Sequence, residues 1–139
     1  MAPPELVDTS VWGRKHLGQV GDWLQARLMA DEVGITDIVK LELLHSPRNA
    51  KEWDAFRGDL DALPRAPVGP DEWRRALDVM GMLARRGHHT GPGPADFLIA
   101  AAAESQGWTL VHYDNHYDLI VDCTGQPARW VVDRGSLPQ

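Results

Sequence analysis

The chain has 139 residues, of which 43% are hydrophobic and 24% charged, and its formal net charge is −6. These values are typical of one globular domain with a hydrophobic core, and they exclude a chain that is disordered throughout. They also exclude nucleic-acid binding through bulk positive charge, so any such binding has to be local. Carboxylates gathered around a cation would explain part of the acidic balance.

We expect neither a targeting segment nor a disulfide, from simple features of the sequence. Residues 1–7 have neither a basic start nor an apolar stretch, and no run approaches the roughly 20 apolar residues of a membrane helix. Cys123 is the only cysteine, which excludes an intramolecular disulfide and a cysteine-based zinc cluster. We therefore expect a cytoplasmic protein that does not enter a membrane.

The first half of the chain alternates short strands with helices. Residues 5–10 predict a strand that carries Asp8 near its C-terminal end, and residues 33–35 predict a second strand. Thr36 is a suitable N-cap for the helix after the second strand, and Pro47 is a suitable start for the next helix. A further helix is expected between the two strands, which gives three helices in this half. Their apolar faces are, in chain order, Leu17, Val20, Leu24 and Leu28, then Ile38, Leu41 and Leu44 or His45, and finally Trp53, Phe56, Leu60 and Leu63.

The second half continues this alternation. The expected elements are a helix from Pro70 or Asp71 to a C-cap at Gly87, a Gly- and Pro-rich loop over 88–94, a helix from Pro94 to about Gln106, a strand over 108–113 and an edge strand over 129–132. The apolar face of the first of these helices is Trp73, Leu77, Met80 and Leu83. Short strands between longer helices indicate a single α/β domain with a parallel sheet.

Four acidic residues are candidates for one site, because ligands of open α/β sheets bind beyond the C-terminal ends of the strands. Asp8 and Asp114 fall at expected strand ends. Asp96 lies in the first turn of a helix, and Glu42 lies in the helix after the second strand. Carboxylate oxygens suit Mg²⁺ or Mn²⁺, and without a cation clustered carboxylates repel one another. Such a cluster fits a metal site for phosphoryl chemistry.

Each acid also has a structural interpretation that the spacing leaves open. Asp8 fits the cap of a turn at residues 9–10, and Asp96 fits an acid favoured at a helix N-terminus. Glu42 fits a surface position on its helix, and Asp114 fits a turn. If the four side chains lie close together in space, the metal site is favoured over these separate structural interpretations.

Five segments, in order, resemble one protein family. They are residues 6–12, 35–44, 96–103, 110–120 and 124–131. They resemble the opening strand, the second, third and fourth motifs, and the C-terminal end of PIN-domain ribonucleases, specifically the VapC-type toxins of toxin–antitoxin modules. The resemblance implies one PIN-like three-layer domain over residues 1–139, with a central, mainly parallel sheet of four to five strands flanked by helices.

The resemblance also implies an activity: Mg²⁺- or Mn²⁺-dependent hydrolysis of RNA phosphodiester bonds. The implied catalytic and metal-binding acids are Asp8, Glu42, Asp96 and Asp114. Many relatives carry another acid two residues after the position of Asp114, where this sequence has His116. His116 itself or Asp118 is a candidate replacement, and a solvated loop histidine is the alternative. Ser10 is the candidate uncharged helper, with a simple turn role as its alternative.

The partners that the resemblance implies are RNA, a VapB-like antitoxin that blocks the site, and a second copy of the chain in a homodimer. Candidate RNA-binding residues are Arg14, Lys15, Arg85 and Arg86, each of which also fits an ordinary solvated face. Trp12 fits the core or a dimer contact, or a base stack. Two other functions stay open, a metal-dependent phosphatase or phosphotransferase and a non-catalytic PIN-like binding module. The aspartyl-phosphate type of phosphatase usually begins Asp-x-Asp, and Ser10 stands where its second acid would be.

Overall fold

A parallel sheet carries the candidate site. The computed structural model describes residues 2–138, and within them four strands pair in the order β2-β1-β3-β4, all parallel. The strands are β1 Glu5–Val7, β2 Val33–Gly34, β3 Leu110–His112 and β4 Ala128–Trp130. The helices are α1 Thr9–Trp12, α2 Gly18–Met29, α3 Asp37–Leu43, α4 Ala50–Asp61, α5 Pro70–Ala84, α6 Pro94–Gln106 and α7 His116–Thr124.

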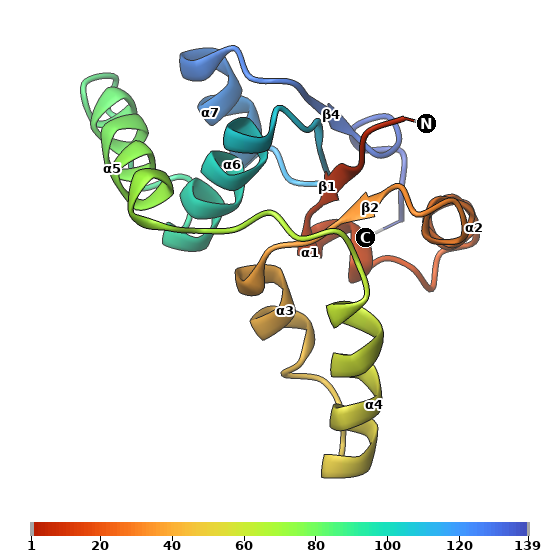
Figure 1. Ribbon diagram of the computed structural model, residues 1–139. Helices are drawn as coiled ribbons and strands as arrows, with labels where there is room; N and C mark the ends of the chain where they lie inside the picture. The colour runs from red at the N-terminus through yellow and green to blue at the C-terminus, as the bar shows by residue number, and fades with distance from the viewer. Residues whose placement is uncertain (1, 139) are drawn as a thin grey trace.

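Helices lie on both sides of this sheet (Figure 1). α5, α6 and α7 lie to one side of the strands and α2 lies to the other, while α3 and α4 extend from one end. α5 packs on both α6 and α7. This arrangement confirms the predicted three-layer α/β fold, and β4 is an edge strand as expected. Within residues 2–138, no helix combines the length and the apolar character that a membrane crossing requires.

The helix α6 is buried on almost all sides, which fixes the position of its first turn. Residues 97–103 are all buried, and four of them are the consecutive alanines that allow neighbouring elements to approach closely. Pro94 occupies the first turn, and Gly107 ends the helix with a φ of 69°. Asp96 therefore stands on a rigid support.

Two helix boundaries differ from those predicted. α4 begins after Asn49 and not at Pro47, because the Asn49 side chain accepts a hydrogen bond of 2.9 Å from the backbone N–H of Glu52. α5 ends at Ala84, and Gly87 follows it outside the helix with a φ of 75°. The strands are also shorter at their ends than the sequence predicts.

Three apolar residues that helical spacing places on packed faces are exposed instead. Leu41 is 74% exposed, and Trp73 and Leu77 are 55% and 68% exposed. On α5 the buried residues are Ala76, Val79 and Leu83, so Leu83 is buried as predicted, whereas Ala76 and Val79 are each one position before the predicted Leu77 and Met80. Spacing alone does not decide which of two adjacent apolar stripes faces the neighbouring helix. Trp12, in contrast, is 5% exposed and belongs to the core.

Two helices are present that the sequence analysis did not predict. α1 is a single turn that starts directly after Asp8. α7 follows Asn115, buries Tyr117 and Ile120, and ends at Gly125 with a φ of 67°. Both begin within a few residues of the end of a strand, so both bring side chains to the C-terminal edge of the sheet.

Candidate metal centre

Asp8 is held in one orientation by two hydrogen bonds. It follows β1 directly and caps α1, where its Oδ2 accepts from the backbone N–H of Ser10 at 3.0 Å. Its Oδ1 accepts from the hydroxyl of Tyr117 at 2.6 Å. The residue is only 5% exposed, so these donors replace water at the carboxylate.

Tyr117 is a residue of this site that the sequence analysis missed. It is fully buried on α7, and its hydroxyl points at a carboxylate 109 positions away in the chain. Burial raises the pKa of Tyr117 well above its ordinary value, and the charges of Asp8 and Asp96 raise it further. The hydroxyl therefore stays protonated and acts as a fixed hydrogen-bond donor.

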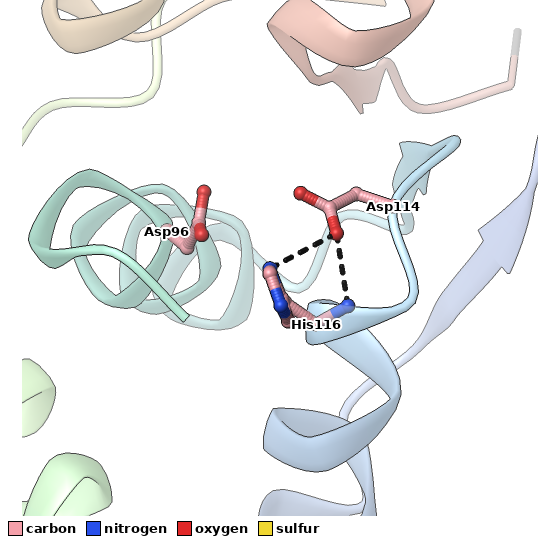
Figure 2. Close-up of side chains that lie close together, drawn as sticks. All are labelled: Asp96, Asp114 and His116. Carbon is pink, nitrogen blue, oxygen red and sulfur yellow. Dashed lines mark hydrogen bonds and ion pairs between the residues drawn. The ribbon is translucent and has the colours of Figure 1, made fainter. Parts of the chain in front are cut away.

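Asp96 and Asp114 meet His116 at the edge of the sheet (Figure 2). One ligand atom from each of the three residues lies within 4.8 Å of the others. Asp96 Oδ2 also accepts from the N–H of Gly93 at 2.9 Å, which ties the carboxylate to the start of α6. Asp114 Oδ1 accepts from the backbone N–H of His116 at 2.9 Å, and the His116 ring nitrogen Nδ1 lies 3.3 Å from the same oxygen.

The electrostatics of this edge are those of crowded, unpaired acids. Burial raises the pKa of Asp96, and the charges of Asp8 and Asp114 raise it further against the opposing effect of the Gly93 N–H. Within residues 2–138, the ion pairs involve Asp114 only through His116, and none includes Asp8 or Asp96. Hard oxygen ligands without a basic partner are the donor set that Mg²⁺ or Mn²⁺ prefers.

Glu42 reaches this region through one hydrogen bond. It is exposed on α3, as its surface interpretation predicts, and its Oε1 accepts from the hydroxyl of Thr9 at 2.8 Å. Thr9 is the neighbour of Asp8, so the fourth acid lies next to the turn that carries the first. Glu42 is not part of the close group formed by Asp96, Asp114 and His116.

The three auxiliary candidates have different surroundings. His116 joins the acid group, whereas Asp118 accepts from the indole N–H of Trp130 at 3.2 Å and faces Arg134 at 3.6 Å. The hydroxyl of Ser10 accepts from the backbone N–H of Tyr113 at 2.9 Å, so its contact with an acid is made by its backbone.

His112 is a second residue that the sequence analysis missed. It is 1% exposed at the end of β3, and burial lowers its pKa against the raising effect of nearby carboxylates such as that of Asp118. Its Nδ1 accepts from the backbone N–H of Asp114 at 3.2 Å. The neutral imidazole therefore fixes the turn on which Asp114 stands.

The candidate RNA-binding cations are placed differently from one another. Arg14 is half-buried, donates to the backbone oxygen of Ser10 at 2.7 Å and lies 4.8 Å above the ring of Tyr113. Lys15 is exposed and lies 5.6 Å from the ring centre of Phe56. Arg85 and Arg86 are exposed just beyond α5. Of these four residues, Arg14 has contacts that join it to the acid-bearing turns.

Comparison with known proteins identifies the family. The profile of the PIN domain family matches residues 6–121. This chain belongs to the PIN domain family. Ribonuclease VapC18 of Mycobacterium tuberculosis (strain ATCC 25618 / H37Rv) is 44% identical to it over 133 residues, which cover 94% of this chain and 97% of that protein. Ribonuclease VapC51 of the same strain is 37% identical and covers 99% of both chains.

Solved structures share the fold of this PIN domain. The DNA-bound VapBC from Salmonella typhimurium matches with a TM-score of 0.70 and 17% identity over 93% of this chain and 98% of that chain. VapBC-5 from Mycobacterium tuberculosis matches with a TM-score of 0.61 and 20% identity over 95% of this chain and 100% of that chain. The fold that the sequence resemblance implies is therefore confirmed.

Proposed function

We propose that this PIN domain is a VapC-like toxin, a metal-dependent ribonuclease that hydrolyses RNA phosphodiester bonds and is inhibited by a VapB-like antitoxin. The family supports the ribonuclease class. So do two relatives that are named ribonucleases and that align with this chain over nearly their whole length. The observation that carries the metal dependence is the convergence of Asp8, Asp96 and Asp114 without a Lys or Arg partner within residues 2–138.

The residues present fit one or two divalent cations, Mg²⁺ or Mn²⁺. Asp96 and Asp114 would hold the cation directly, with Asp8 beside them, and Glu42 and His116 are the further candidate ligands. A bound cation supplies positive charge at the phosphate and makes a water molecule more acidic. The protein's own part is to keep the carboxylates oriented: Tyr117 and Ser10 fix Asp8, and Gly93 fixes Asp96.

The partners follow from the same site. Arg14 is the candidate cation that lies nearest the acid-bearing turns, so it is our first choice for a contact with an RNA phosphate, ahead of Lys15, Arg85 and Arg86. An antitoxin arginine is suited to block the site, because its planar fork can engage two carboxylate oxygens in place of the cation. Two of the solved structures that share this fold are VapBC proteins, which supports a VapB-like partner here.

A homodimer and a cytoplasmic location stay predictions of the sequence. The exposed Trp73 and Leu77 on α5 support self-association, because they form an apolar surface together with Met80 of the same helix. Two further tryptophans on helices, Trp23 of α2 and Trp53 of α4, lie beside Arg27 and Arg57.

The direct test is cleavage of single-stranded RNA by the purified chain. We expect cleavage with Mn²⁺ or Mg²⁺ and none in EDTA. Asp8→Asn and Asp96→Asn should each lower the rate at least about hundredfold, since each removes a charge from the site. Asp122→Asn is the matched control, because Asp122 is exposed on α7. Full activity in EDTA, or in either site variant, would show the mechanism to be wrong.

A further inference from the structure

A hollow of about 470 Å³ opens beside Asp114 at the C-terminal edge of the sheet. Its walls come from Ser10 and Arg14 after β1, from the turn after β3, from Trp130 at the end of β4, and from residues of the C-terminal tail between 134 and 138. The volume lies within the roughly 300–1,000 Å³ that small-molecule sites occupy. Because Asp114 lines the hollow and also belongs to the acid group, the hollow adjoins the proposed metal centre.

The C-terminal tail builds one wall of this hollow and is anchored there. After β4 the chain turns, with a hydrogen bond of 3.0 Å from the N–H of Ser136 to the oxygen of Asp133 and a φ of 77° at Gly135. Leu137 is then 9% exposed, and its backbone N–H donates to the hydroxyl of Tyr113 at 3.2 Å. The tail therefore returns to the turn that precedes Asp114, and it is tied to that turn.

Two arginines and two aromatic rings line the same hollow. Arg14 lies over the ring of Tyr113, and Arg134 lies 5.5 Å from the ring centre of Trp130. Arg134 is 62% exposed, and its one ion pair among residues 2–138 is the long contact of 3.6 Å with Asp118. Both guanidinium groups thus keep N–H donors for an anion. The chain as a whole has a net charge of −6, and carboxylates such as Asp114 repel anions, yet Arg14 and Arg134 line the same hollow as Asp114.

We propose that this hollow is a subsite for one nucleotide of the RNA next to the cleaved bond. Arg134 and Arg14 contact its phosphate, and Tyr113 and Trp130 contact its base or ribose. The chemistry of the walls matches a nucleotide, which is anionic at one end and flat and apolar at the other. The inference rests on the proposed ribonuclease function and adds Arg134 and the tail, neither of which the sequence analysis assigned to the site.

The test compares Arg134→Ala with Arg74→Ala, which removes the same charge from an exposed position on α5. Binding of a fluorescently labelled single-stranded RNA is measured by anisotropy in EDTA, and cleavage is measured with Mn²⁺. Arg134→Ala should raise the Kd and the KM about tenfold, and it should reduce the slope of log Kd against log salt by about 0.7, the value for one lost phosphate contact. Arg134→Lys should restore most of the binding.

Three results would overturn the subsite. The first is equal Kd and KM values for Arg134→Ala and Arg74→Ala, and the second is a loss of kcat alone in Arg134→Ala. The third is normal RNA binding by Arg134→Ala together with loss of its co-purification with a co-expressed VapB-like antitoxin. The last result would assign the hollow to a protein partner. Failure of the wild-type chain to cleave any RNA would instead reject the proposed function, so the two failures are distinguishable. Arg14→Lys serves as a second variant, and it keeps the charge where Arg14 also supports the Ser10 turn.

Discussion

Acidic residues have opposite surroundings at the edge of the sheet and in the arm formed by α3, α4 and the following residues to Arg65. In the arm, each of Asp37, Glu52 and Asp61 has its pKa lowered by a hydrogen-bonded cation, which is Arg65, Arg48 or Lys40 respectively. At the sheet edge, burial and neighbouring carboxylates raise the pKa of Asp96 instead. Cations of the protein itself therefore pair with these three acids of the arm, whereas no Lys or Arg among residues 2–138 pairs with Asp8 or Asp96 at the sheet edge.

The largest difference that we expect between the two regions is in the response to Mn²⁺. Millimolar Mn²⁺ should raise the Tm of the wild-type protein by roughly 5 °C or more, because the ion binds only the folded state. Asp96→Asn should lose most of this shift, whereas Asp61→Asn in the arm should keep it. A differential scanning fluorimetry series in Mn²⁺ and in EDTA measures both. An equal Mn²⁺ shift in both variants would contradict the distinction.

A smaller effect on Mn²⁺ binding and catalysis is expected for Tyr117→Phe, which tests whether the Tyr117 hydroxyl orients Asp8. The ring still fills the core, but Asp8 Oδ1 loses its hydroxyl donor. The Mn²⁺ affinity and kcat should each fall about tenfold, as for other groups that orient a ligand, while the KM for RNA stays the same. Isothermal titration with Mn²⁺ and cleavage kinetics measure these values.

Tyr113→Phe is the matched control for the Mn²⁺ affinity, because the Tyr113 hydroxyl contacts Leu137 and not a carboxylate. It should bind Mn²⁺ like the wild type. If Tyr117→Phe also binds Mn²⁺ like the wild type, the hydroxyl serves the core and does not position Asp8.

The smallest effects concern the pH dependence of stability in EDTA. The lowered pKa of Asp37 contributes stability above about pH 4 that is lost as the pH falls through the folded-state pKa, so Asp37→Asn should destabilise at pH 7 by about 0.5 kcal/mol and have a smaller effect in acid. The raised pKa of Asp96 has the opposite sign, because the folded state binds the proton more tightly. Asp96→Asn should therefore stabilise the metal-free protein at pH 7, with a gain that disappears in acid. Urea unfolding at several pH values measures both variants.

A loss of stability for Asp96→Asn at pH 7 in EDTA would contradict the crowding of acids at the sheet edge. For the arm, the contradicting outcome is an Asp37→Asn effect that persists unchanged at pH 3. Asp54→Asn, which changes an exposed residue of α4, controls for the loss of one negative charge.

The sequence predicted the strands, the helices other than α1 and α7, and the acids near the strand ends, because these features depend on local patterns. Asp8 follows β1 directly, and Asp114 stands two residues after the end of β3. Local patterns did not reveal Tyr117, because its contact with Asp8 joins residues 109 positions apart. The helical spacing of the buried Tyr117 and Ile120, followed by Gly125, was the signal that could have identified α7.

Positions of side chains on helix faces were the weakest part of the sequence analysis. Leu77 and the buried Ala76 are adjacent on α5, so one residue of rotation exchanges the packed and the exposed stripes. The tail was missed for a related reason. Arg134 has no motif around it, and its importance depends on the turn at Gly135 that returns Leu137 to Tyr113.

Direct binding of Mn²⁺ tests the central claim, that the unpaired carboxylates of the sheet edge form a cation site. Electron paramagnetic resonance measures free Mn²⁺ during a titration of the EDTA-treated and desalted protein, without RNA and without turnover. We predict saturable binding by the wild type and by Asp122→Asn, and an affinity at least about tenfold weaker in Asp96→Asn. Equal Mn²⁺ affinity in all three proteins, or no saturable binding by the wild type at millimolar Mn²⁺, would contradict the account.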